Sequence, residues 1–173
     1  MYIGLGSNLG DREEQLLRAV KALGCIDAVA VLRRSSLYDS APVGGPPQPR
    51  YLNAVVELAC GLVPQQLLSI AKQIELDLGR FPSVGWGPRA VDLDVLLWGG
   101  QVVADANLQV PHLGLHQRQF VLDPLCELCP ELVHPVLGVS MQTLLQRLRP
   151  QDVLPFDSVR WPFAQQPFLE TAK

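Results

Sequence analysis

The run Trp86-Gly-Pro-Arg-Ala-Val-Asp-Leu-Asp-Val-Leu-Leu97 places two acids two residues apart within an apolar stretch. The apolar members of the run favour strands or buried cores. Because strand side chains alternate between the faces of a sheet, Asp92 and Asp94 are expected on one face, about 6.5–7 Å apart at Cα. Two bare carboxylates on a buried strand are costly, so the pair requires counter-charge. The pattern indicates a divalent cation or a phosphate ligand with its cation; the alternative is an acid pair on the solvated face of an edge strand.

The size and charge of the chain exclude several classes of protein. Its 173 residues are enough for one domain with a buried core. A net charge of −3 argues against a general nucleic-acid binder, which would carry a basic excess. Charged residues follow almost at once after Met1, so no signal peptide is expected, and no apolar run is long enough to span a bilayer. These features predict a cytoplasmic protein with reduced cysteines.

Cys126 and Cys129 form a C-x-x-C pair. A structural zinc site would require two further ligands at suitable spacing, and only His134 lies near. Both cysteines stand among leucine and valine residues, as small buried hydrophobic residues do. We therefore expect core packing rather than metal binding.

Local signals define two helices and one long loop. Asp11 is placed to cap a helix that ends at Gly24. Pro64 is placed to open a second helix that ends at Gly79. Repeated proline and glycine exclude regular structure from residues 41–50, which are expected to form a prominent loop.

The order of the elements predicts the fold class. Strand, helix, strand, strand, helix and strand in succession fit an α+β fold, a ferredoxin-like α/β sandwich in which helices cover a mostly antiparallel sheet. After Pro150 the periodicity is weak, so we expect a single domain at 1–150 and a C-terminal extension at 151–173. The other expected elements are strands at 2–7, 28–38, 51–60 and 102–103, and helices at 118–128 and 140–148.

The loop at 80–90 carries Arg80 and Arg89 towards the acid strand. Arginine offers a planar fork that matches phosphate oxygens, and a loop broken by glycine and proline can close over a substrate. The loop therefore predicts a phosphate lid; the alternative is that both arginines are solvated or paired with surface acids. By contrast, Gly4-x-Gly6-Ser7 is too short for a dinucleotide fingerprint.

Together these segments resemble one family, 6-hydroxymethyl-7,8-dihydropterin pyrophosphokinase, an enzyme of folate biosynthesis. The resemblance runs in the family's order and spacing over residues 2–138, and its most specific block is Trp86-Gly-Pro-Arg-Ala-Val-Asp-Leu-Asp94. The other blocks are Gly4-Leu-Gly-Ser-Asn-Leu9, Ser35-Ser-Leu-Tyr38 with Pro42-Val-Gly44, Gln48-Pro-Arg-Tyr-Leu-Asn53, Ile74-Glu75 with Gly79-Arg80, Val110-Pro-His112, Arg118-Gln-Phe-Val-Leu-Asp-Pro-Leu125 and Pro130-Glu-Leu-Val-His-Pro135.

The resemblance implies that the 1–150 unit is a pyrophosphokinase domain, which moves pyrophosphate from ATP to the hydroxymethyl group of a reduced pterin and leaves AMP. Asp92 and Asp94 would ligate two Mg²⁺ ions that bridge the ATP phosphates for in-line attack on the β-phosphorus. Arg80, Arg89 and His112 would complete the catalytic set by holding phosphate oxygens. The residues implied on the ATP side are Glu75, Arg80, Trp86, Arg89, Val95, His112 and Arg118.

The same resemblance implies a pterin site. The ring would stack between Tyr51 and Phe120, with Asn53 on its edge. The residues implied in pterin contact are Ser40, Val43, Gly44, Tyr51, Asn53, Trp86, Asp92 and Phe120. The expected partners are therefore ATP and the pterin, with neither nucleic acid nor membrane. The protein is expected to be a monomer that contacts neighbouring folate-pathway enzymes at most transiently.

The sequence departs from the family pattern in the loop. Phe81-Pro82 stand where a second arginine often follows, and Gly85 stands at a frequently basic position. We hypothesise slower loop closure or product release for this reason. A nucleotidyltransferase is the alternative enzyme, but Ser7 and Asp92 lie too far apart in the chain for its motif. The other alternative is a catalytically weak pterin- or nucleotide-binding relative, against which the retained acids argue.

Overall fold

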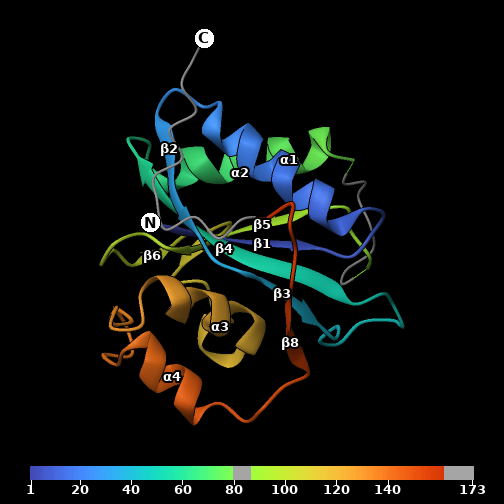
Figure 1. Ribbon diagram of the computed structural model, residues 1–173. Coiled ribbons are helices and arrows are strands. Elements are labelled where there is room, and N and C mark those ends of the chain that lie inside the picture. Colours follow the sequence, from blue (N-terminus) through green and yellow to red (C-terminus); the bar gives the residue numbers. More distant parts are fainter. Residues whose placement is uncertain (80–86, 162–173) are drawn as a thin grey trace.

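A computed structural model describes residues 1–79 and 87–161 of the chain. An antiparallel sheet forms the centre of the described part of the chain (Figure 1). Its strand order is β5-β1-β4-β3-β8, and β2 also pairs with β4. Its strands are β1 (Tyr2–Ser7), β2 (Val29–Arg34), β3 (Leu37–Ser40), β4 (Tyr51–Cys60), β5 (Asp92–Leu97) and β8 (Val153–Phe156). This arrangement confirms the predicted α+β fold with a mostly antiparallel sheet.

Helices cover both faces of the sheet (Figure 1). Helices α1 (Arg12–Gly24) and α2 (Pro64–Asp77) pack on one face, where the larger hydrophobic core lies. Helices α3 (Gln119–Leu128) and α4 (Met141–Arg147) pack on the other face over a second core. The connection to α3 contains the short strands β6 (Val103–Ala104) and β7 (Gln109–Val110) and the 3₁₀ turn η1 (Leu115–Gln117). None of the helices in the described ranges is long and apolar enough to cross a membrane.

The helix boundaries follow the local signals. The Asp11 carboxylate accepts a hydrogen bond from the Glu14 N–H at 3.1 Å and so caps α1. Helix α2 begins at Pro64 as predicted, and Gly79 follows it with a φ of 91°, a value that favours glycine. Ser140 caps α4 through the N–H of Thr143. Both long helices thus start and stop within two residues of their predicted bounds.

The stretch predicted as one strand over 28–38 is divided into β2 and β3. The division falls at Ser35, whose backbone N–H donates to Val55 O while its hydroxyl accepts from the Val55 N–H, both at 2.9 Å. The Ser35 hydroxyl therefore takes the place of a backbone carbonyl as the acceptor for the Val55 N–H. The chain can turn at Ser35 between β2 and β3, and the Val55 N–H is not left unsatisfied.

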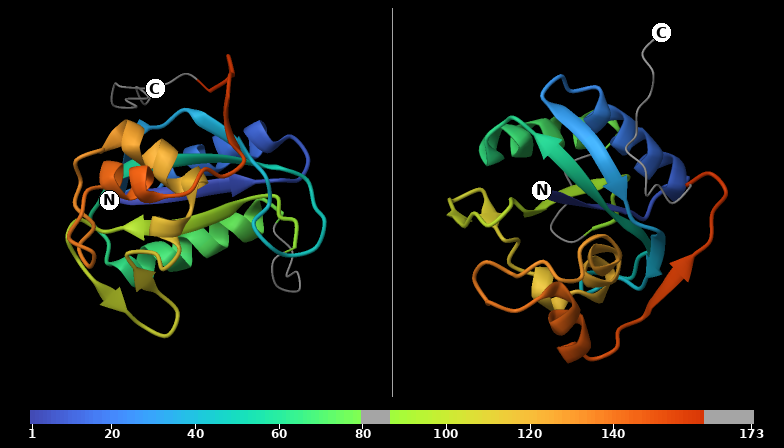
Figure 2. Two further views of the ribbon diagram at one scale, coloured as in Figure 1. Left: turned by 90° about the horizontal axis from the view of Figure 1, so that it is seen from below. Right: turned by 60° about the vertical axis from the view of Figure 1, so that its left-hand side comes forward.

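The chain after Pro150 adds an unpredicted strand. Strand β8 pairs with β3 at the edge of the sheet, and the following residues run towards α1 (Figure 2, right). Arg160 there forms salt bridges with Asp11 and Glu13, and the indole N–H of Trp161 donates to Ser35 O at 2.8 Å. Trp161 is buried against the larger core. Residues 153–161 are thus ordered against the sheet and α1, while the domain boundary at 150 stays a prediction.

Candidate active site

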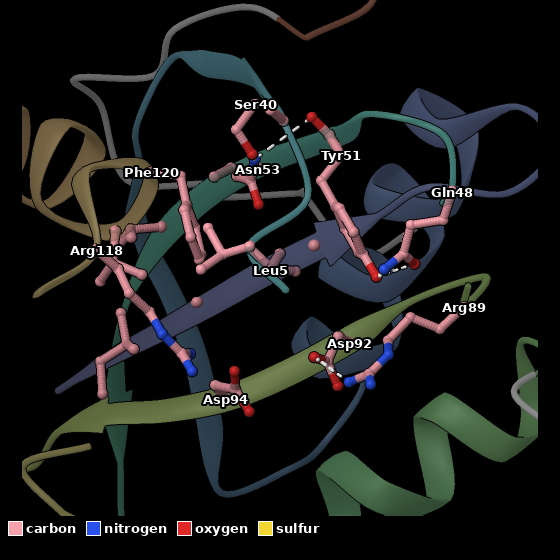
Figure 3. A pocket seen from close by; sticks show the side chains of 18 residues that line it. Leu5, Ser40, Gln48, Tyr51, Asn53, Arg89, Asp92, Asp94, Arg118 and Phe120 are labelled. Atoms are coloured by element: carbon pink, nitrogen blue, oxygen red, sulfur yellow. Dashed lines mark hydrogen bonds and ion pairs between the residues drawn. The ribbon is translucent and has the colours of Figure 1, made fainter. Parts of the chain in front are cut away.

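A pocket opens on the face of the sheet that carries α3, over strands β1, β4 and β5 (Figure 3). Its floor lies on β1, where Gly4 and Gly6 present no side chain to the pocket. A Cβ built on Gly6 would lie 3.6 Å from Asn53 Oδ1 and 4.0 Å from Asp92 Cβ. Glycine at this position therefore keeps a space open between a polar side chain on β4 and an acid on β5.

Asp92 and Asp94 both line this pocket. Their register partners across β1 are Gly6 and Gly4, so the two carboxylates project from the same face of β5. Asp92 forms a salt bridge with Arg89 at 2.8 Å. Across the described residues, no hydrogen bond or salt bridge reaches the Asp94 carboxylate. Burial first, and then the negative charge of Asp92, raise the pKa of Asp94 to about 6.

The donor chemistry of this pair suits a hard divalent cation. Mg²⁺ takes oxygen ligands and is commonly held by one or two carboxylates together with substrate phosphates and water. The described residues gather no group of three or more His, Cys, Asp and Glu side chains able to hold a metal. Asp92 and Asp94 therefore fit a cation that a phosphate-bearing ligand shares, rather than a closed protein cage.

Asn8 connects the segment before β5 to the long loop and was not singled out from the sequence. Its Oδ1 accepts from the Arg89 N–H at 2.8 Å, and its Nδ2 donates to Gln48 Oε1 at 3.1 Å and Pro49 O at 3.2 Å. Asn8 is 1% exposed. The Tyr51 hydroxyl donates to the same Gln48 oxygen at 3.1 Å. The signal that could have identified Asn8 is its place directly after the Gly-Ser turn at the end of β1.

The rest of the pocket lining includes most of the residues predicted to contact a pterin. Ser40, Val43, Tyr51, Asn53 and Phe120 all line the pocket, whereas Gly44 is exposed and outside its lining. Asn53 Nδ2 donates to Ser40 Oγ at 2.9 Å and to the Tyr38 carbonyl at 3.1 Å. These two bonds fix the amide so that its oxygen faces the pocket floor, where it can accept a hydrogen bond from a ligand (Figure 3).

The residues predicted on the ATP side occupy different environments. Glu75 is 1% exposed, and its Oε1 accepts from the Leu93 N–H at 2.7 Å and from Lys72 Nζ at 2.9 Å. Burial is the main cause that raises the pKa of Glu75, and the hydrogen bonds oppose it. Val95 is buried in the core under α2, so its side chain does not line the pocket. Glu75 and Val95 thus support strand β5 from its other face.

Arg118 lines the pocket from the segment that precedes α3, whereas His112, in the same segment, is outside the lining. Burial and the positive charge of Arg118 lower the pKa of His112, so its imidazole is neutral at pH 7. Arg118 lines the pocket with its Cζ 5.8 Å from the centre of the Phe120 ring, and its side chain extends towards Asp94 (Figure 3). The remaining predicted residues, Arg80 and Trp86, lie outside the described residues.

The cysteine pair of the sequence lies away from this pocket. Cys126 and Cys129 carry free thiols and pack against the second core beneath α3. Burial raises the pKa of the Cys126 thiol to about 12, so the thiolate that would bind a metal is disfavoured. His134 instead accepts hydrogen bonds from the backbone N–H groups of Val136 and Leu137. The predicted packing role of the cysteines agrees with these contacts.

Comparison with known proteins relates this site to one family. Residues 2–130 match the family model of 7,8-dihydro-6-hydroxymethylpterin-pyrophosphokinase (HPPK). A 2-amino-4-hydroxy-6-hydroxymethyldihydropteridine pyrophosphokinase of Bacillus subtilis is 46% identical over 131 residues, which cover 76% of this chain and 78% of that protein. The protein of the same name from Methylorubrum extorquens is 40% identical over 152 residues, covering 88% of this chain and 95% of its own length.

Longer proteins contain the same unit. The chain is 38% identical to the folic acid synthesis protein fol1 of Pneumocystis carinii over 155 residues, 90% of this chain, but it spans only 21% of fol1. The solved structure of wild-type Plasmodium falciparum HPPK-DHPS has the same fold, with a TM-score of 0.64 at 14% identity over 84% of this chain and 44% of that one. By its family match and by its similarity to full-length relatives, the chain belongs to the 7,8-dihydro-6-hydroxymethylpterin-pyrophosphokinase family.

Proposed function

We propose that this chain transfers the terminal pyrophosphoryl group of ATP to 6-hydroxymethyl-7,8-dihydropterin, in a step of folate biosynthesis. The hydroxymethyl oxygen attacks the β-phosphorus and loses its proton, the bond from that phosphorus to the α,β-bridging oxygen breaks, and AMP leaves. The observation that carries the proposal is a pair of carboxylates, one of them without a bonded partner in the described chain, at the end of a pocket with aromatic walls.

Asp92 and Asp94 would hold two Mg²⁺ ions together with the ATP phosphates. Bound Mg²⁺ would neutralise phosphate charge and favour in-line displacement at the β-phosphorus. The Arg89 guanidinium, now paired with Asp92 at 2.8 Å, lies where it can exchange that carboxylate for a phosphate oxygen when the cation takes Asp92.

The pterin would lie between the rings of Tyr51 and Phe120, which stand on opposite sides of the pocket (Figure 3). Asn53 Oδ1 would accept a hydrogen bond from an N–H of the ring, because its Nδ2 is already engaged by Ser40 and Tyr38. Asn53 and Asp92 both lie opposite Gly6, one on each neighbouring strand. A flat ring anchored at Asn53 can therefore extend its hydroxymethyl group across Gly6 towards the acids.

His112 and Arg118 would contact the phosphates from the α3 side, with Arg80 and Trp86 contributed by the loop at 80–90. The departures in that loop, Phe81-Pro82 and Gly85, support slower closure than in a relative with two arginines. We further propose a monomer in the cytoplasm, with residues 1–150 as the catalytic domain and transient contact with neighbouring enzymes of the pathway.

The test is AMP production from ATP and Mg²⁺, with and without 6-hydroxymethyl-7,8-dihydropterin. Pterin-dependent AMP that is lost in Asp92→Ala and Asp94→Ala is the expected result. The matched control is Asp27→Ala, which removes an exposed carboxylate far from the pocket lining. Saturable pterin and ATP binding without any AMP would instead identify a catalytically weak relative and refute the proposed reaction.

A further inference from the structure

Gly114 lies in the turn between β7 and α3, at a backbone conformation that does not require glycine. Its φ is −88° and its ψ is 0°, a conformation with negative φ that L residues adopt in type I turns. The turn is held by backbone bonds on both sides, from the Leu115 N–H to His112 O at 3.0 Å and from the Gln117 N–H to Gly114 O at 3.2 Å. A reason for glycine here must therefore come from what surrounds it.

A side chain at Gly114 would have to displace the Arg118 guanidinium. A Cβ built on Gly114 would lie 2.6 Å from Arg118 Nε and 2.8 Å from Arg118 Cζ. Carbon and nitrogen atoms without a bond between them do not approach so closely, since their contact distances lie near 3.5 Å. The guanidinium of Arg118 therefore rests directly on the bare face of Gly114.

The other side of the Arg118 guanidinium faces the pocket. Arg118 lines the pocket beside Phe120, and Figure 3 shows its side chain reaching towards Asp94. The positive charge of Arg118 interacts with both Asp94 and His112. Because the guanidinium is held between the turn and the pocket, its N–H donors point in one fixed direction. This orientation favours bidentate binding of a phosphate group.

Gly114 also contacts His112 through its backbone. Its N–H points at His112 Nδ1, 3.1 Å away. Because a backbone N–H can only donate, Nδ1 is the acceptor, and the neutral ring carries its proton on Nε2. The backbone of His112 is itself fixed, since its N–H donates to Leu96 O on β5 at 2.9 Å. His112 thus offers one N–H donor, Nε2–H, to a ligand.

We infer that Gly114 is a positioning residue of this site, whose missing side chain makes room for the Arg118 guanidinium and whose N–H orients the His112 ring. The inference rests on the proposed function for the identity of the ligand, the triphosphate of ATP. It assigns two separate tasks to one residue, and a change to alanine separates them. Alanine adds the Cβ that displaces Arg118 but keeps the N–H that holds His112.

The affinity test uses a non-hydrolysable ATP analogue, α,β-methylene-ATP, with Mg²⁺ and the full chain. Gly114→Ala is expected to weaken binding about 10- to 100-fold, the same loss as Arg118→Ala, without lowering the melting temperature. The matched control is Gly100→Ala, because a Cβ at Gly100 meets no atom within 4 Å. In the Arg118→Ala background, Gly114→Ala should cause no further loss. Wild-type affinity in Gly114→Ala, or a further loss in the double variant, would overturn the inference.

A second readout needs no ligand and separates this inference from the proposed function. In ¹⁵N NMR spectra, the Arg118 Nε–Hε resonance should shift in Gly114→Ala and stay in place in Gly100→Ala. The His112 nitrogens should show the Nε2-protonated tautomer in all three proteins. An unmoved Arg118 resonance or an Nδ1-protonated His112 would refute the positioning role even if the chain makes AMP. Absence of AMP with both spectra as expected would refute the proposed reaction alone.

Discussion

Asp94→Asn should make the protein more stable and inactive at the same time. Burial and the charge of Asp92 raise the pKa of Asp94 from 3.8 to about 6, so the ionised carboxylate destabilises the folded state. Between these two values the native state binds more protons than the unfolded state, and stability falls as pH rises. Relative to a pH at which Asp94 is protonated in both states, its ionisation lowers the free energy of unfolding by about 1 kcal/mol at pH 4.5 and by about 3 kcal/mol at pH 7.5.

Asparagine removes the charge, but its amide must still be buried and it loses the attraction of Arg118 and Arg89. The free energy of unfolding of Asp94→Asn at pH 7.5 is therefore expected to exceed that of the wild type by about 1–3 kcal/mol. Urea unfolding at pH 4.5, 6.0 and 7.5 measures it, with exposed Asp27→Asn as the control for net charge. The gain should grow with pH. Mg²⁺ with an ATP analogue should then stabilise the wild type much more than the variant. A gain that is absent, or equal at all three pH values, would refute the electrostatic reasoning.

Three further predictions concern the pocket and the C-terminal segment. Tyr51→Ala and Phe120→Ala should each weaken pterin binding much more than ATP binding in calorimetric titrations, and an equal loss of both affinities would contradict the stacking assignment. Gly6→Ala should fold normally, because its Cβ meets its neighbours only at 3.6 Å or more, yet it should weaken pterin binding by raising the pocket floor; unchanged pterin affinity would rule this out. Trp161→Ala should lower the free energy of unfolding by about 3–5 kcal/mol in urea titrations, as for other buried aromatics, whereas a loss below about 1 kcal/mol would show that residues 153–161 contribute little to stability.

The parts of the fold that the sequence predicted are those with local signals. Asp11, Pro64 and Gly79 mark helix ends through capping and backbone preference, which depend on few neighbours. Strand β8 was missed because Pro155 interrupts its pattern and Leu154 is 58% exposed, so neither alternation nor burial marks it. Its strand character comes from pairing with β3, more than a hundred residues earlier in the chain. Such non-local pairing leaves no periodic trace in the sequence.

In the site, as in the fold, the sequence predicted what depends on local signals and missed what depends on tertiary contacts. Alternation along a strand suffices to put Asp92 and Asp94 on one face, but it does not tell which of them has a partner. Arg89 pairs with Asp92 because Asn8 holds the Arg89 backbone at the end of β1. Val95 was predicted beside ATP on family resemblance, and its side chain points into the opposite core, as its position between two same-face neighbours requires. These differences arise from the tertiary placement of residues distant in sequence.

The position of β1 between β4 and β5 suits the proposal that one pocket takes both ATP and the pterin. Gly6 pairs with Asn53 on one side and with Asp92 on the other, so the Cα atoms of these two residues stand two strand spacings apart, about 10 Å, and a Cβ at Gly6 would lie within 4.0 Å of both side chains. Any larger residue at Gly6 would put a side chain under the path between the ring and the acids. The glycines of β1, too few for a dinucleotide fingerprint, therefore keep the floor between Asn53 and the carboxylate pair free of side chains, as the proposed pterin site requires.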